Sequence, residues 1–72
     1  MAQTKETKLI LALNRYNELK RVQETEYQKK YDDFRRFGEY EKIAELNYNN
    51  IEELDAIERG YIQTIFKIFE ED

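Results

Sequence analysis

The sequence predicts an all-α protein that folds as an antiparallel helical hairpin. Three observations lead to this fold class: the 72 residues include no proline, the two glycines stand at positions 38 and 60, and apolar residues recur at helical spacing on both sides of Gly38. Glycine and proline most often mark helix ends, and Gly38 lies almost at the midpoint of the chain. We therefore expect one helical domain over residues 1–72, with helices at about 5–37 and about 39–70.

The residues around Gly38 favour a turn at that position. Arg35 and Arg36 precede the glycine, and cations are stabilised at the negative end of a helix dipole. Glu39 and Glu41 follow it, and anions are stabilised at the positive end of the next helix. Glycine just after a helix readily takes up the left-handed conformation that closes such a turn.

Apolar residues on each helix form a stripe in which the spacing alternates between four and three, as in antiparallel bundles. We expect these two stripes to be the surfaces through which the helices pack. On the first helix the stripe comprises Leu9, Leu13, Tyr16, Lys20, Gln23, Tyr27, Lys30, Phe34 and Phe37. On the second helix it comprises Tyr40, Ala44, Asn47, Ile51, Leu54, Glu58, Tyr61, Ile65 and Ile68.

Two charged residues interrupt these stripes at similar distances from the turn. Lys20 on the first helix falls within one turn of Glu58 on the second, so the pattern predicts an interhelical ion pair that sets the register. Such pairs contribute little net stability but penalise wrong alignments. The alternative is that both long side chains reach solvent along the edge of the stripe.

The second helix contains one segment that could interrupt it. Asn47-Tyr48-Asn49-Asn50 is a run of poor helix formers, and Asn50 with Glu53 three residues later fits a capping box. A break there would give helices at 39–48 and 50–70 and a three-helix bundle. We favour one continuous helix, in which Gly60 is a point of close packing.

The open end of the hairpin carries more apolar residues than one seam can bury. Neighbouring positions point in different directions around a helix, so part of this cluster must face away from the other helix. A short chain also buries a limited share of its surface, and most small oligomers are symmetric homodimers. We expect a homodimer that forms a four-helix bundle, or a docking site for another protein, through Leu9, Ile10, Leu11, Leu13, Ile62, Ile65, Phe66 and Phe69.

Composition excludes several kinds of chemistry. The chain has no cysteine, no histidine and no serine, which removes disulfides, thiolate or imidazole metal sites and the usual nucleophile–base pairs. We predict a protein that is not an enzyme and has neither cofactor nor metal. No apolar run is long enough to span a membrane and the first residues lack a signal-peptide core, so we expect a cytoplasmic location.

One short segment resembles a motif of the small helical-hairpin phosphatases that act on sporulation phosphorelay proteins. In Ile51-Glu52-Glu53-Leu54-Asp55, the last three residues match the family's Ser-Gln-Glu-Leu-Asp pattern, whereas Ile51 and Glu52 replace the serine and glutamine. The resemblance implies a functional role for Asp55, but it covers five residues and an acidic helix readily contains such a sequence.

Charge is divided unevenly between the halves of the chain. Residues 1–37 hold nine Lys/Arg and six Asp/Glu, and residues 38–72 hold three Lys/Arg and ten Asp/Glu. This polarity favours antiparallel pairing, or it displays each charge to a different partner. The acidic face of the second helix comprises Glu41, Glu45, Glu52, Glu53 and Asp55.

These observations predict a protein–protein interaction module. It would be a small regulator or inhibitor, antitoxin-like or phage counter-defence-like, that binds and blocks a partner protein, with the acidic helix able to mimic nucleic acid. The alternative is an RNA- or DNA-binding hairpin dimer, because the architecture resembles that of the plasmid-encoded RNA-binding hairpin dimers of the Rop type. The salt dependence of partner binding would identify mimicry.

Overall fold

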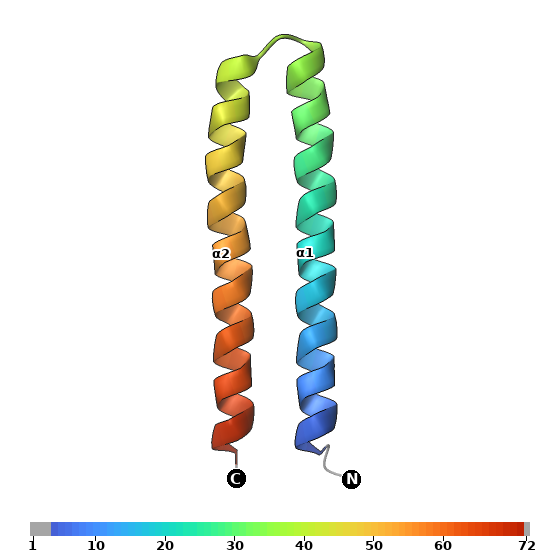
Figure 1. Ribbon diagram of the computed structural model, residues 1–72, viewed down its shortest axis with the longest axis vertical. Coiled ribbons are helices and arrows are strands. Elements are labelled where there is room, and N and C mark those ends of the chain that lie inside the picture. Colours follow the sequence, from blue (N-terminus) through green and yellow to red (C-terminus); the bar gives the residue numbers. More distant parts are fainter. Residues whose placement is uncertain (1–3, 72) are drawn as a thin grey trace.

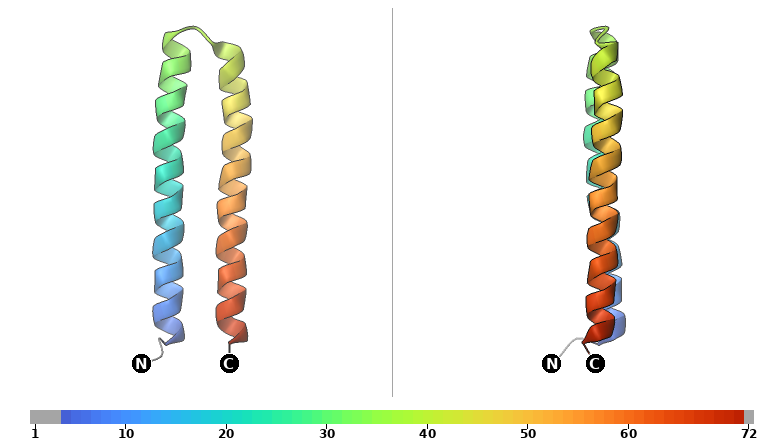
Figure 2. Two further views of the ribbon diagram at one scale, coloured as in Figure 1. Left: turned by 180° about the vertical axis from the view of Figure 1, so that it is seen from behind. Right: turned by 90° about the vertical axis from the view of Figure 1, so that its left-hand side faces the viewer.

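The computed structural model describes residues 4–71, which form two long helices that pack side by side and antiparallel (Figure 1). Helix α1 spans Lys5–Arg36 and helix α2 spans Tyr40–Glu70. The molecule measures 54 × 17 × 11 Å, and the side view shows that it is one helix thick (Figure 2). The predicted helical hairpin is therefore confirmed, and both of its broad faces lie open.

Local capping interactions define the first helix and the turn. The backbone amide of Thr7 donates to the hydroxyl of Thr4, the residue that precedes α1, over 3.2 Å. At the other end, the amide of Glu39 donates to the carbonyl of Phe34 over 2.8 Å and the amide of Gly38 donates to that of Arg35 over 3.3 Å. With Gly38 at φ 69°, this is a glycine-closed helix end of the Schellman type.

The two glycines lead to a paired prediction about stability. A Cβ at Gly38 would meet no atom within 4 Å, so Gly38→Ala adds only the backbone strain of positive φ and should destabilise the protein by about 1 kcal/mol. Gly60 lies inside α2, so Gly60→Ala should stabilise it by up to about 1 kcal/mol. Thermal unfolding at one protein concentration compares both variants. Equal unfolding midpoints for Gly38→Ala and Gly60→Ala would contradict the assignment of Gly38 to the turn.

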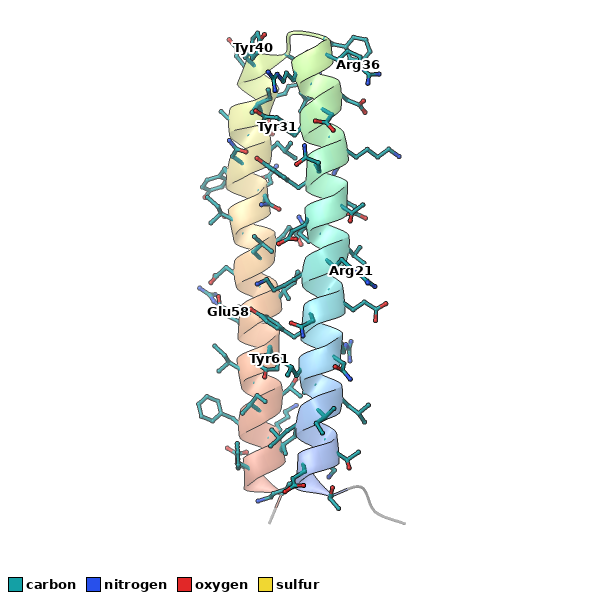
Figure 3. All side chains as sticks on the ribbon, turned by 45° about the vertical axis from the view of Figure 1, so that its right-hand side comes forward. Arg21, Tyr31, Arg36, Tyr40, Glu58 and Tyr61 are labelled. Atoms are coloured by element: carbon teal, nitrogen blue, oxygen red, sulfur yellow. The ribbon has the colours of Figure 1, made fainter. Side chains whose placement is uncertain are left out.

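The seam between the helices combines stacked rings with polar pairs. The rings of Tyr16 and Tyr61 stack with centroids 4.5 Å apart, and Figure 3 shows Tyr61 between the two helices. The side-chain amide of Gln23 donates to the carbonyl oxygen of Asn50 over 3.1 Å, and the Tyr27 hydroxyl donates to Asn47. The asparagines thus bond across the seam, and α2 continues through them, so the alternative three-helix fold is wrong.

The predicted stripe of α1 follows the seam along most of its length, whereas the predicted stripe of α2 departs from the seam toward the turn. The predicted positions of α1 that are half-buried are Leu9, Tyr16, Lys20, Gln23, Tyr27 and Phe34. On α2, Leu54, Tyr61, Ile65 and Ile68 are at least half-buried as expected. The other half-buried residues of α2 toward the turn are Ile57, Asn50, Leu46 and Ile43. The seam follows the natural period of a straight α-helix, which drifts by about 20° per heptad from a strict seven-residue repeat. The predicted inward positions that are instead exposed are Leu13, Lys30, Phe37, Tyr40, Ala44, Asn47, Ile51 and Glu58.

The predicted ion pair between Lys20 and Glu58 does not form within the chain. The Lys20 ammonium lies over the Tyr16 ring, 5.3 Å from its centroid, and Glu58 is exposed. An ion pair between Lys8 and Glu71 joins the helices at the open end. Other ion pairs join residues close in sequence, such as Asp55 and Arg59 at 3.0 Å.

Very little of the hairpin is buried. Among the described residues Ile68 alone is buried, with 6% of its surface exposed. The exposed area is 6230 Å², whereas a compact monomer of this mass exposes about 4,800 Å². The hairpin therefore leaves on the order of 1,000 Å² of additional surface uncovered.

Candidate protein-binding surfaces

A groove runs along one face of the hairpin, near its open end. It encloses about 670 Å³ and is lined by residues of both helices. Helix α1 contributes Lys8, Leu11, Ala12, Arg15, Tyr16 and Leu19, and helix α2 contributes Ala56, Ile57, Gly60, Tyr61, Thr64 and Ile68. We refer to this feature as the groove and to the opposite side of the hairpin as the back face.

Small residues create the groove. Ala12, Ala56 and Gly60 line it where larger side chains would fill the space between the helices. A Cβ added to Gly60 would meet no atom within 4 Å, so Gly60 is not a point of close packing within the hairpin. Glycine inside a helix costs about 1 kcal/mol relative to alanine, and no contact within the hairpin requires it.

The rim of the groove combines apolar and charged side chains. Leu11 and Leu19 are 50% and 44% exposed along its α1 side, together with Arg15. A second hollow adjoins Ala56 and Gly60 on the α2 side, and its lining includes Glu52 and two ion-paired residues, Asp55 and Arg59. The α1 side thus presents Arg15, and the α2 side presents Glu52 beside the ion pair of Asp55 and Arg59.

The back face carries a second set of exposed apolar residues. Successive helical residues are about 100° apart, so Ile51 and Phe69, each nine positions from Gly60, point away from the groove. By the same geometry Ile62 lies about 200° around α2 from Gly60, and Leu13 lies about 200° around α1 from Leu11. The back-face residues are exposed by 44% to 66%, and they are Leu13, Ile51, Ile62 and Phe69.

The structure distributes the predicted interface residues over several surfaces. Leu9 and Ile65 are half-buried in the seam, and Leu11 lines the groove. Leu13, Ile62 and Phe69 lie on the back face. Ile10 and Phe66 are 59% and 63% exposed beside that face, toward the outer sides of their helices. The predicted single cluster is thus two apolar surfaces on opposite sides of the hairpin.

The predicted acidic residues are all exposed on α2. Glu41, Glu45 and Glu52 are four and seven positions apart, so they share one side of the helix, away from α1. Glu53 lies nearer the groove, about 100° further around the helix than Glu52. Asp55 forms an ion pair with Arg59, which reduces the negative charge on this part of the surface.

Within residues 4–71 there is no group of three or more acidic side chains placed to hold a metal ion. No helix in this range has the length and apolar character needed to cross a membrane. Comparison with protein-family models, curated proteins and solved structures yields no match. The geometry of the two apolar faces therefore carries the functional argument.

Sequence reasoning did not identify the groove. Leu19, Ala56 and Thr64 line it but were not assigned to any surface, because they lie beside the apolar stripes and not within them. The available signal was the spacing of Ala56 and Gly60, four residues apart on one side of α2.

Proposed function

We propose that this protein is a non-enzymatic binding module that accepts an amphipathic helix of a partner protein in the groove. The observation that carries the proposal is Gly60, an internal helix glycine that lines the groove and at which an added Cβ would meet no atom within 4 Å. A glycine at such a position lets the backbone of another helix approach closely. Covering a helix that the partner needs elsewhere would make the protein a regulator or inhibitor.

The shape and lining of the groove suit a helical ligand. Leu11, Leu19 and Ile57 offer apolar contacts along the length of the groove, and Ala12 and Ala56 leave room between them. A helix with apolar side chains at i, i+3, i+4 and i+7 presents a matching stripe, which is how helices generally bind in grooves. An extended peptide would leave its backbone hydrogen-bonding groups unpaired against these apolar walls.

The charges beside the groove restrict which helix would bind. Arg15 lies on the α1 side, whereas Glu52 and Glu53 lie on or near the α2 side. The best ligand is a helix with acidic residues along one flank and basic residues along the other. Exposed charge pairs contribute mainly to orientation and association rate, so binding should weaken moderately with added salt.

Filling the groove should abolish ligand binding. The probe is a helical peptide selected on the wild-type protein from a displayed library of amphipathic 18-residue sequences, and fluorescence anisotropy measures its affinity. Gly60→Leu places a bulky side chain where the ligand backbone would lie, and we expect at least a tenfold loss of affinity, equivalent to about 1.4 kcal/mol.

Phe66→Ala removes an exposed side chain outside the groove, so this control should leave the affinity of the same peptide unchanged. Selected peptides that bind Gly60→Leu as tightly as the wild type would contradict the proposal. Selected sequences without the two oppositely charged flanks would contradict the assigned orientation.

The turn end favours nucleic acid binding as a second candidate function. Phe37 and Tyr40 are 71% and 69% exposed there, beside Arg35 and Arg36, and Figure 3 shows Arg36 and Tyr40 at this end of the molecule. Exposed aromatic rings next to arginines can stack on unpaired bases. A gel shift with single-stranded RNA at low salt tests this candidate separately from peptide binding.

A further inference from the structure

The apolar surface of α2 is wider than the seam that the hairpin provides. Tyr40, Ile51 and Phe69 are separated by eleven and eighteen residues, close to three and five full turns, so they share one side of the helix. Each is more than half exposed. The heptad pattern assigned Tyr40 and Ile51 to the interior, and the hairpin leaves both on the back face.

The area of exposed surface favours a second copy of the chain as the partner that covers this face. The hairpin exposes on the order of 1,000 Å² more than a compact monomer of its mass. This excess is spread over both faces of the hairpin. If each of two chains covered about half of it, their interface would bury on the order of 1,000 Å², the least that a specific interface is expected to bury. A second copy of the chain also supplies the same apolar residues, so its back face matches in extent and in chemistry.

We propose that two copies of this chain pack back face to back face as a four-helix bundle, with Lys20 of each chain bound to Glu58 of the other. This inference goes beyond the proposed function, because the groove remains open on the outer side of the bundle. Lys20 follows Leu13 by seven residues and Glu58 follows Ile51 by seven, so both charges lie on the side that the second copy covers.

The position of the two charges along the helices supports their pairing between chains. Lys20 lies near the middle of α1 (Lys5–Arg36), and Glu58 lies near the middle of α2 (Tyr40–Glu70). In a bundle whose twofold axis runs parallel to the helices, α1 packs against the second copy's α2, so Lys20 and the second copy's Glu58 lie at similar levels on neighbouring helices. Within one chain the two do not pair, and the Lys20 ammonium rests over its own Tyr16 ring.

Such a pair would determine how the chains align. Two charges that become covered in the interface contribute little net stability, but a misalignment leaves each of them covered without a partner. Apolar contacts such as those of Ile62 and Phe69 tolerate sliding more readily. The ion pair between chains then plays the register role that the heptad pattern indicated for Lys20 and Glu58.

The test combines two charge-reversal variants, Lys20→Glu and Glu58→Lys. In a homodimer of either variant, like charges lie opposite each other at both ion-pair positions. We therefore expect the dissociation constant of that homodimer to rise at least tenfold. Mixed in equal amounts, the two variants restore both opposite-charge pairs, so the mixed dimer should form within about threefold of the wild-type affinity. Sedimentation equilibrium measures association, and native mass spectrometry of one isotope-labelled chain identifies the mixed species.

The controls are Lys29→Glu and Glu45→Lys, which make the same charge changes at exposed positions away from the back face and should leave self-association unchanged. A single variant that fails to fold but regains helical circular dichroism on mixing also supports the proposal. A chain that carries both reversals, Lys20→Glu and Glu58→Lys, is compared with the mixture. If self-association is restored in this double variant but not in the mixture, the pair lies within one chain and the proposal is overturned. A wild-type chain that stays monomeric at about 100 µM, a test concentration in the range where weak dimers form, would also overturn the proposal.

Discussion

Ile62→Asp is expected to abolish self-association and, with it, most of the stability of the hairpin. In the single chain Ile62 is 45% exposed, so the hairpin alone predicts a small effect. In a back-face dimer the same position is covered in both copies. Losing an isoleucine contact and covering a carboxylate should then cost about 3 kcal/mol or more per copy.

Val22→Asp is the matched control. Val22 is 49% exposed in α1 and lines neither the groove nor the back face. Its replacement introduces the same residue into a helix interior and should change stability by less than about 1 kcal/mol.

Circular dichroism thermal unfolding over a hundredfold range of protein concentration measures both effects. Folding coupled to dimer formation makes the wild-type midpoint rise with concentration. The Ile62→Asp variant should be largely unfolded at the lowest concentration. If the wild-type midpoint does not depend on concentration and both variants melt alike, the back face is free in solution and the dimer is wrong.

Ile68→Ala should produce the largest loss among substitutions within the seam. Ile68 is the one buried residue of the described range, and replacing a buried isoleucine with alanine costs about 2 to 4 kcal/mol. Leu11→Ala removes a similar volume from a side chain that is 50% exposed at the groove rim, so it should cost less than about 1 kcal/mol.

Urea denaturation at one fixed protein concentration compares these two variants, with equal slopes confirming that the same surface unfolds in each. A loss for Leu11→Ala as large as that for Ile68→Ala would show that the groove is filled in the folded protein. That outcome would also remove the basis for ligand binding there.

The parts of this protein that depend on local physics can be predicted from its residues alone. A lone mid-chain glycine flanked by arginines and glutamates specifies one turn, because only glycine adopts positive φ without strain and the flanking charges suit the helix dipoles. The apolar positions Tyr61, Ile65 and Ile68 were likewise placed correctly, since errors in the assumed period are small within two turns of helix. The expected continuity of α2 through Asn47 and Asn50 is also confirmed.

The side of α2 that meets α1 in the half nearer the turn could be assigned only from the packed hairpin. Over thirty residues the difference between a straight helix and a strict heptad repeat shifts the seam by about one residue, which moves Ile51 and Tyr40 out of it and Asn50 and Ile43 into it. The same rotation places Gly60 in an open groove. These assignments depend on how the two helices pack against each other. That packing is a long-range property that the residue pattern of either helix alone does not predict.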